Sequence, residues 1–203
     1  MAEQFPIRIS AGFFLFAASL LMLLPIQWVA AMLIAGAIHE FFHITAIYLL
    51  SGKVISVSVA MRGTVIETDE MSSSRELFCA LAGPIGSALL VLLIRWFPRL
   101  AICGAAHCAF NLLPLFPLDG GRVLRSLLSL LFRPNISDRL WNCSQIILRV
   151  ILMIGAIYLS IRFGIMTLIL GIVILRGVRT EKLLANRPFW RYNNRNIAKG
   201  VQL

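Results

Sequence analysis

The sequence predicts an all-α integral membrane protein with about six transmembrane helices and one small β-hairpin. Of the 203 residues, 59% are hydrophobic and only 14% are charged, and the mean hydropathy is +0.86. A soluble domain is normally about a quarter charged and roughly 45–50% apolar. The apolar residues also come in long blocks, which favours membrane spans over an enlarged soluble core.

Six apolar blocks are long enough to be membrane spans. They lie at about 9–28, 29–50, 77–96, 100–121, 142–160 and 163–178, and the fourth continues as a helix to about 131. Pro25 separates the first two spans. Within the fourth, Pro114 and Pro117 interrupt the helical hydrogen-bond ladder, so a break in that helix is expected.

The connection at 51–76 is the one sizeable polar segment between spans. Val57, Val59 and Met61 alternate with small residues there, and Arg62-Gly63 follows as a turn signal. Alternation with a period of two is typical of a strand. The segment therefore predicts a hairpin whose first strand covers 54–59.

The basic residues predict how the chain is oriented. The net charge is +10, and the excess lies mainly in the tail at 181–203 and in the segment at 122–141. Cytoplasmic loops of membrane proteins are enriched in Lys and Arg, and such segments contact anionic lipid. We therefore expect a membrane domain at 1–180 with cytoplasmic termini, a basic cytoplasmic tail at 181–203, and no nucleic-acid partner.

His39, Glu40 and His43 form the pattern HEFFH inside the second span. Residues four apart share one face of a helix, so two imidazoles can bind one Zn²⁺ at about 2.0–2.1 Å. A glutamate next to the first histidine can act as the general base toward water. An ionisable group costs at least about 2.5–3.5 kcal/mol at the centre of a membrane helix, which favours function over chance.

Asp119 is the natural third ligand, because a hydrolytic zinc site needs three protein ligands and one open position. Apart from Glu40, it is the one acid that falls in or against the apolar spans. It follows the proline break and precedes Gly120-Gly121. With both spans running toward the cytoplasm, all three ligands are expected at similar depth.

Three separate motifs together resemble the site-2 protease family of intramembrane zinc metalloproteases. They are HEFFH at 39–43, AGP at 82–84 and NLLPLFPLDGG at 111–121. The resemblance implies a three-helix catalytic core at about 29–131 and one Zn²⁺ per chain, bound by His39, His43 and Asp119 with Glu40 as the catalytic residue. It also implies that Asn111, Pro114 and Pro117 face the substrate.

Among these proteases the chain is most similar to the stage IV sporulation branch, without the CBS domain that often follows the last span there. This resemblance implies a membrane-tethered substrate of the pro-sigma-factor type, membrane inhibitory partners, and a bacterial cell or forespore membrane. A zinc-binding membrane transporter and a relative without proteolytic activity remain alternatives. The transporter does not require Glu40, and loss of Glu40 is the simplest route to a silent relative.

Overall fold

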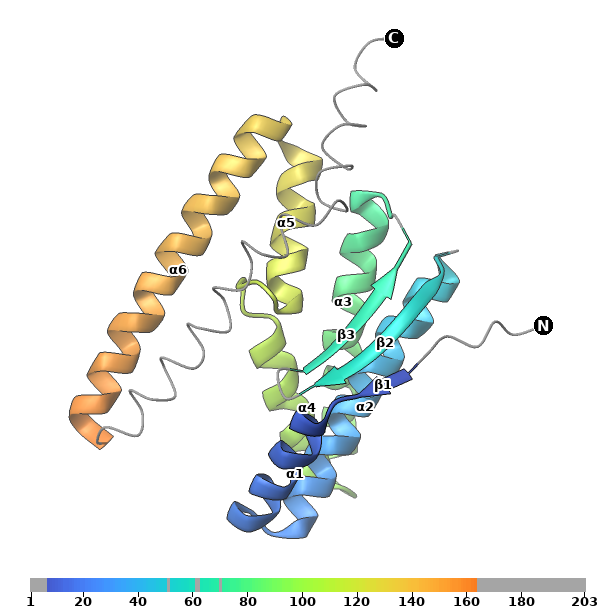
Figure 1. Ribbon diagram of the computed structural model, residues 1–203, viewed down its shortest axis with the longest axis vertical. Coiled ribbons are helices and arrows are strands. Elements are labelled where there is room, and N and C mark those ends of the chain that lie inside the picture. Colours follow the sequence, from blue (N-terminus) through green and yellow to red (C-terminus); the bar gives the residue numbers. More distant parts are fainter. Residues whose placement is uncertain (1–6, 51, 61–62, 70, 164–203) are drawn as a thin grey trace.

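The computed structural model describes residues 7–163 apart from 51, 61, 62 and 70. In chain order the elements are β1 (Ile7–Ile9), α1 (Ala11–Leu23), α2 (Ile26–Leu49), β2 (Val54–Ala60), β3 (Gly63–Thr68), α3 (Ser73–Leu89), the 3₁₀ turn η1 (Leu90–Leu93), α4 (Pro98–Asn111), α5 (Asp119–Leu131) and α6 (Pro134–Phe163). The predicted sixth span and the basic tail lie outside the described residues. Figure 1 shows a helical molecule with the sheet laid along one side.

Within the described part, three helices are long and apolar enough to cross a membrane. They are Ile26–Leu49, Ser73–Leu93 and Pro134–Tyr158. These correspond to the second, third and fifth predicted spans. The helix of the first predicted span is shorter than expected, because α1 has 13 residues and ends just before Pro25. The total of six spans therefore stays a prediction.

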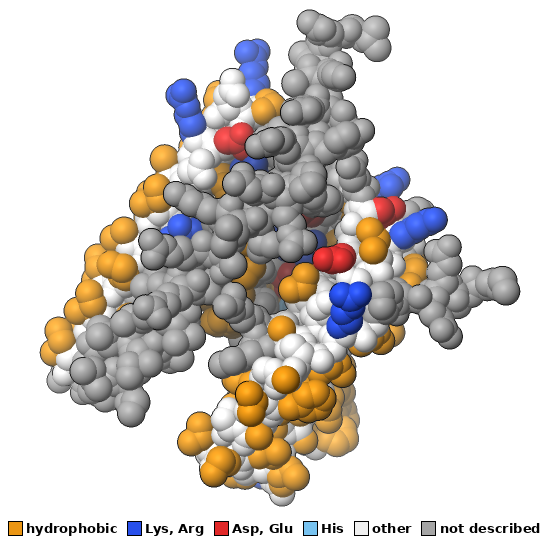
Figure 2. Space-filling model, viewed as in Figure 1, with side chains coloured by type: hydrophobic (Ala, Val, Ile, Leu, Met, Phe, Trp, Pro, Cys, Tyr) orange, Lys and Arg blue, Asp and Glu red, His pale blue; other side chains and the backbone are white. Residues whose placement is uncertain are grey.

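Hydrophobic side chains cover the surface of the outer helices. Figure 2 shows them gathered over α1 and the adjoining part of α2 and along α6, whereas charged side chains lie toward the opposite end of the molecule. Met22 and Leu23 of α1 and Ile154 of α6 are among the exposed apolar residues. Such a distribution is what a lipid environment requires of a membrane protein.

Helices α2, α3 and α4 pack around a core of small and medium side chains, made up of Ala31, Ala35, Leu90 and Cys103. Gly86 of α3 lies directly against the ring of Phe42, in the space that a Cβ would need. Small residues let membrane helices approach closely. This packing brings the predicted zinc helix α2 into direct contact with α3.

The fourth predicted span is two helices rather than one continuous helix. α4 ends at Asn111 and α5 begins at Asp119, and residues 112–118 between them are irregular. The Phe116–Pro117 peptide bond is cis. The two prolines explain the interruption, since each lacks the N–H that the helix needs. The predicted break is therefore confirmed, and it separates α4 from the helix that carries Asp119.

The predicted hairpin is confirmed, but it belongs to a three-stranded sheet of order β1-β2-β3. β2 and β3 are antiparallel, and β1 pairs with β2 in parallel, with Ile7 opposite Val57 and Ile9 opposite Val59. The placement of Ile9 at the start of the first span was wrong, because this residue ends β1. A three-residue strand is too short to show an alternating pattern of its own, so only its long-range pairing reveals it.

Candidate metal centre

The histidines at the centre of the site lie on one face of α2. His39 and His43 are 2% and 4% exposed, and their rings meet edge to face with centroids 4.7 Å apart. The two Nε2 atoms are 3.1 Å apart. The spacing of one helical turn therefore brings both imidazoles to a single point, as the sequence predicts.

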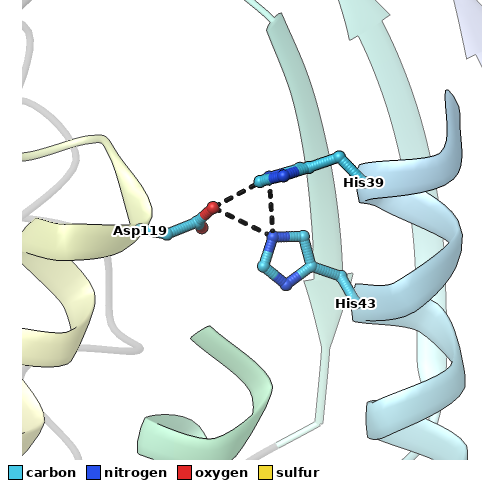
Figure 3. Close-up of side chains that lie close together, drawn as sticks. All are labelled: His39, His43 and Asp119. Carbon is cyan, nitrogen blue, oxygen red and sulfur yellow. Dashed lines mark hydrogen bonds and ion pairs between the residues drawn. The ribbon is translucent and has the colours of Figure 1, made fainter. Parts of the chain in front are cut away.

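Asp119 reaches the same point from the first residue of α5. Its Oδ2 atom lies 2.9 Å from Nε2 of His39 and 3.0 Å from Nε2 of His43 (Figure 3). The side chain is buried, with 7% of the residue exposed. Three potential ligand atoms from two helices thus lie within 4.8 Å of one another.

The hydrogen bond that each ring makes on the side away from the centre indicates which ring nitrogen carries the proton. The other nitrogen then directs its lone pair toward the centre. Nδ1 of His43 lies 2.7 Å from the carbonyl oxygen of Cys79. A carbonyl only accepts hydrogen bonds, so Nδ1 carries the proton and donates it, and Nε2 of the neutral ring is an acceptor. Nδ1 of His39 lies 2.9 Å from Oγ of Ser87, which can accept in the same way.

The point where these groups meet is suited to a cation. Two imidazole lone pairs and a carboxylate oxygen converge there, and acceptors at 2.9–3.1 Å repel one another unless a positive charge lies between them. Tetrahedral zinc at about 2.0–2.1 Å separates its ligands by about 3.3 Å. The three atoms need move apart by only about 0.4 Å to take that ion. The donor set therefore fits zinc.

Gly83 of α3 provides the space in which the two rings lie. A Cβ built on this residue would lie 2.6 Å from Cε1 of His43 and 2.7 Å from Nε2 of His39. Any side chain at position 83 would therefore collide with the potential ligand atoms. The AGP motif at 82–84 thus places a residue without a side chain against the metal centre.

Glu40 lies one residue round the helix from His39 and is partly exposed. Its carboxylate is close enough to His39, His43 and Asp119 to interact with their charges, and the hydroxyl of Thr64 on β3 lies beside it. The carboxylate is therefore adjacent to the three ligands without being one of them. A general base has to lie within hydrogen-bond reach of the water that it activates, so the catalytic role of Glu40 stays a prediction.

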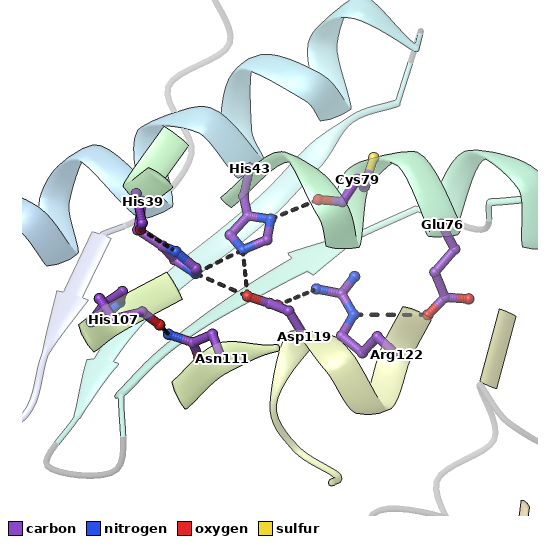
Figure 4. Close-up of polar contacts among 9 residues, drawn as sticks. His39, His43, Glu76, Cys79, His107, Asn111, Asp119 and Arg122 are labelled. Carbon is purple, nitrogen blue, oxygen red and sulfur yellow. Dashed lines mark hydrogen bonds and ion pairs between the residues drawn. The ribbon is translucent and has the colours of Figure 1, made fainter. Parts of the chain in front are cut away.

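The residues predicted to face a substrate lie around the break. The Nδ2 atom of Asn111 donates to the carbonyl of His107 at 3.0 Å, within their own helix. Pro114 is partly buried and Pro117 is exposed. The His107 ring lies edge to face with His39, with centroids 4.6 Å apart. Figure 4 shows His107 and Asn111 on the α4 side of the centre. Their contact with a substrate stays a prediction.

Four groups around the centre were not anticipated from the sequence. Ser87 and the Cys79 carbonyl orient the histidines. Arg122 of α5 extends toward α3 (Figure 4). Its Nη1 atom lies 3.8 Å from Oδ1 of Asp119, and its Nε atom lies 3.9 Å from Oε1 of Glu76 on α3. The i,i+3 spacing of Asp119 and Arg122 is a signal that could have found the arginine. Nothing local points to the other three.

Comparisons with known proteins give one family profile, one sequence relative and one similar fold. Residues 75–155 match the sequence profile of Peptidase family M50, a segment that contains Asp119 but not the two histidines. The chain is 30% identical over 110 residues to a zinc metalloprotease of Methanocaldococcus jannaschii, covering 47% of this chain and 32% of that protein. The chain thus spans about a third of the length of that relative.

The fold is similar to that of a solved structure, the site-2 protease from Methanocaldococcus jannaschii. The TM-score is 0.66 with 21% sequence identity, and the similarity covers 89% of this chain and 92% of that one.

Proposed function

We propose that this chain, which carries a peptidase family M50 domain in the fold of a site-2 protease, is an intramembrane zinc metalloendopeptidase. One observation carries the proposal above all others. Two histidine lone pairs and one carboxylate converge at a buried point in a candidate membrane helix, with a second carboxylate beside them. The named relatives, a zinc metalloprotease and a site-2 protease, support the same chemistry.

Each of these residues has a separate role in peptide hydrolysis. His39, His43 and Asp119 would hold zinc, which would supply Lewis acidity and lower the pKa of a bound water. Glu40 takes a proton from the attacking water and returns it to the amine that leaves. The buried histidines keep their orientation through the hydrogen bonds to Ser87 and the Cys79 carbonyl, so the ligand atoms are preorganised.

Asn111, Pro114 and Pro117 are proposed to bind the substrate segment. An amide carries two N–H donors, and the bond to the His107 carbonyl uses one of those on Asn111. The second can donate to a substrate carbonyl or to the developing oxyanion. The prolines keep the adjoining backbone irregular, so part of it is not committed to a helix.

The sheet offers a second contact for an extended substrate. β2 is the central strand and pairs on both sides. Among the described strands, β1 and β3 lie at the two edges of the sheet, and β3, with six residues, is the longer of the two. A transmembrane substrate must unwind before its peptide bonds can be attacked, and strand addition to β3 would hold it in that form.

The remaining features of topology are proposals that rest on the sequence. We infer six spans within a membrane domain at 1–180, a core at about 29–131, and a basic tail at 181–203. The Lys and Arg of the tail and of 122–141 place the termini in the cytoplasm by the positive-inside rule. The apolar surface of α1 and α6 supports contact with lipid.

The substrate and partners are proposed from the resemblance to the stage IV sporulation branch. They are a membrane-tethered precursor of the pro-sigma-factor type and membrane inhibitory partners, in a bacterial cell or forespore membrane. A zinc transporter is the main alternative. It is less well supported, because a transport site has no need of Glu40 beside the ligands. A silent relative is also disfavoured, because the base is present.

The test measures the zinc content of the purified protein and its cleavage of a co-expressed substrate of the pro-sigma type. We expect about one zinc per chain in the wild type and in Glu40→Gln, and less in Asp119→Ala. Only the wild type should cut. Asp138→Asn, which removes a carboxylate paired with Arg125 away from the centre, is the matched control and should behave as wild type.

The outcomes separate the metal site from the activity. Zinc in the wild type with no effect of Glu40→Gln on cleavage would exclude Glu40 as the base. A wild type that contains no zinc after purification without chelators would overturn both the metal centre and the mechanism. A zinc-loaded wild type that moves zinc across vesicles without cutting any peptide would favour the transporter.

A further inference from the structure

The break at 112–118 poses a hydrogen-bonding problem, because backbone groups at membrane depth need partners. The prolines at 114 and 117 have no N–H. The N–H groups of Leu112, Leu113, Leu115 and Leu118 donate to backbone carbonyls at Cys108, Phe110, Leu113 and Leu115 respectively. The N–H of Phe116 is the remaining donor of the segment, and its partner lies on another helix.

That partner is the side chain of Gln145 on α6. Oε1 of Gln145 accepts from the Phe116 N–H at 3.1 Å, and Nε2 donates to the Pro114 carbonyl at 2.9 Å. The residue is 3% exposed. One amide therefore bonds to the backbone on both sides of Leu115, as a neighbouring peptide group would. A buried donor left without a partner is unfavourable, so this contact favours one conformation of the break.

The backbone held by Gln145 supports the first turn of α5. A Cβ built on Gly121 would lie 2.6 Å from the Leu115 carbonyl and 2.7 Å from the Phe116 nitrogen. The turn that begins with Asp119 therefore lies directly against Phe116, which Gln145 bonds, and against Leu115, which lies between the two residues that Gln145 bonds. If the backbone at Phe116 moves, the carboxylate three residues later moves with it.

We propose that Gln145 is a positioning residue for Asp119, setting the place of the metal-binding carboxylate through the backbone of the break. The inference rests on the proposed zinc site and adds a residue of α6 to its supporting structure. It also means that a change in how α6 packs against residues 112–118 would change the geometry of the metal centre. Gln145 itself touches neither metal nor substrate.

Gln145→Leu removes both hydrogen bonds while keeping a side chain of similar size. We expect its zinc affinity, measured by competition with a chromophoric chelator in detergent, to fall about 10- to 100-fold. Gln145→Glu keeps an acceptor for Phe116 but loses the donor to Pro114, so a smaller loss is expected. Asn142→Leu removes an exposed amide from the same helix and is the matched control.

Zinc affinity is the decisive measurement, because a merely structural role would lower thermal stability without changing the affinity of the folded protein. A folded Gln145→Leu that binds zinc as tightly as the wild type would overturn this inference and leave the proposed function standing. A wild type that binds no zinc would overturn both. If the leucine variant does not fold, Gln145→Asn takes its place, and wild-type affinity in that variant would equally count against the inference.

Discussion

The two sides of the metal centre are held by different kinds of structure. His39 and His43 lie on an unbroken 24-residue helix, and each ring makes a hydrogen bond to α3. Asp119 follows seven residues of irregular backbone, which are held from α6 by Gln145. The histidine side is thus fixed by helical geometry and close packing, whereas the aspartate side depends on a distant amide.

This difference indicates which changes each side tolerates. On the histidine side the ligand atoms lie against α3 with no spare room, so added volume should be more damaging than a lost hydrogen bond. On the aspartate side the carboxylate is placed by backbone hydrogen bonds, so lost polar contacts should dominate. Three substitutions, taken from the largest expected effect to the smallest, test this comparison.

Gly83→Ala should have the largest effect. Its methyl group would occupy space within 3.0 Å of both imidazoles, and packed interiors do not absorb such an overlap cheaply. We expect zinc affinity to fall at least about 100-fold and cleavage to be lost. Gly155→Ala is the control, because a Cβ there meets nothing within 4 Å. Tight zinc binding by Gly83→Ala would show that the rings have more freedom than their packing indicates.

Ser87→Ala should have an intermediate effect, because it removes the oxygen that faces Nδ1 of His39 but adds no volume. We expect about a tenfold loss of zinc affinity in the same chelator competition, since the ring loses its orienting partner. Ser144→Ala, whose hydroxyl bonds to the Trp141 carbonyl in its own helix, should leave affinity unchanged. Equal affinities for the two variants would mean that packing alone orients His39.

Arg122→Gln should have the smallest effect and the opposite sign. The arginine is partly exposed and 3.8 Å from Asp119, too long for a positioning hydrogen bond. Removing a positive charge near a cation site should tighten zinc binding by less than about fivefold, and salt should abolish the difference. Arg122→Lys keeps the charge and should match the wild type. Weaker binding by Arg122→Gln would show that the arginine positions the carboxylate after all.

The parts of the site that rest on local spacing could be predicted from the sequence. His39 and His43 follow from one helical turn, and Asp119 follows from being the remaining acid in the apolar spans. Ser87 and Gln145 could not be predicted, because their partners lie 48 and 29 residues away. Neither residue belongs to a sequence pattern that predicts such a contact.

The fold shows the same limit. The long apolar blocks predicted α2, α3 and α6, and the prolines predicted the break before Asp119. Strand β1 was missed, because its three residues form a strand only by pairing with β2. Helix propensity and hydropathy describe a segment by itself, whereas a short strand is defined by the partner that it meets.

That short strand fixes the depth of the sheet. Ile9 of β1 pairs with Val59, and Val59 pairs with Thr64, whose hydroxyl lies beside Glu40. α1 starts two residues after Ile9, and its 13 residues carry the chain about 20 Å away from the sheet. α2 runs back beside α1 (Figure 1), and His39 lies 13 residues after its first residue, a rise of about 20 Å. The paired residues Ile9, Val59 and Thr64 of the sheet therefore lie at about the depth of the metal centre.

Lipid chains offer no hydrogen bonds to a strand edge at such depth, so the outer N–H and C=O groups of β3 must face water or a peptide. When no peptide is bound, the edge is therefore hydrated. Hydrolysis consumes one water molecule for each bond cut, and that molecule has to reach a site enclosed by apolar helices. Water on the edge of β3 would lie close to Glu40, the residue proposed to activate it.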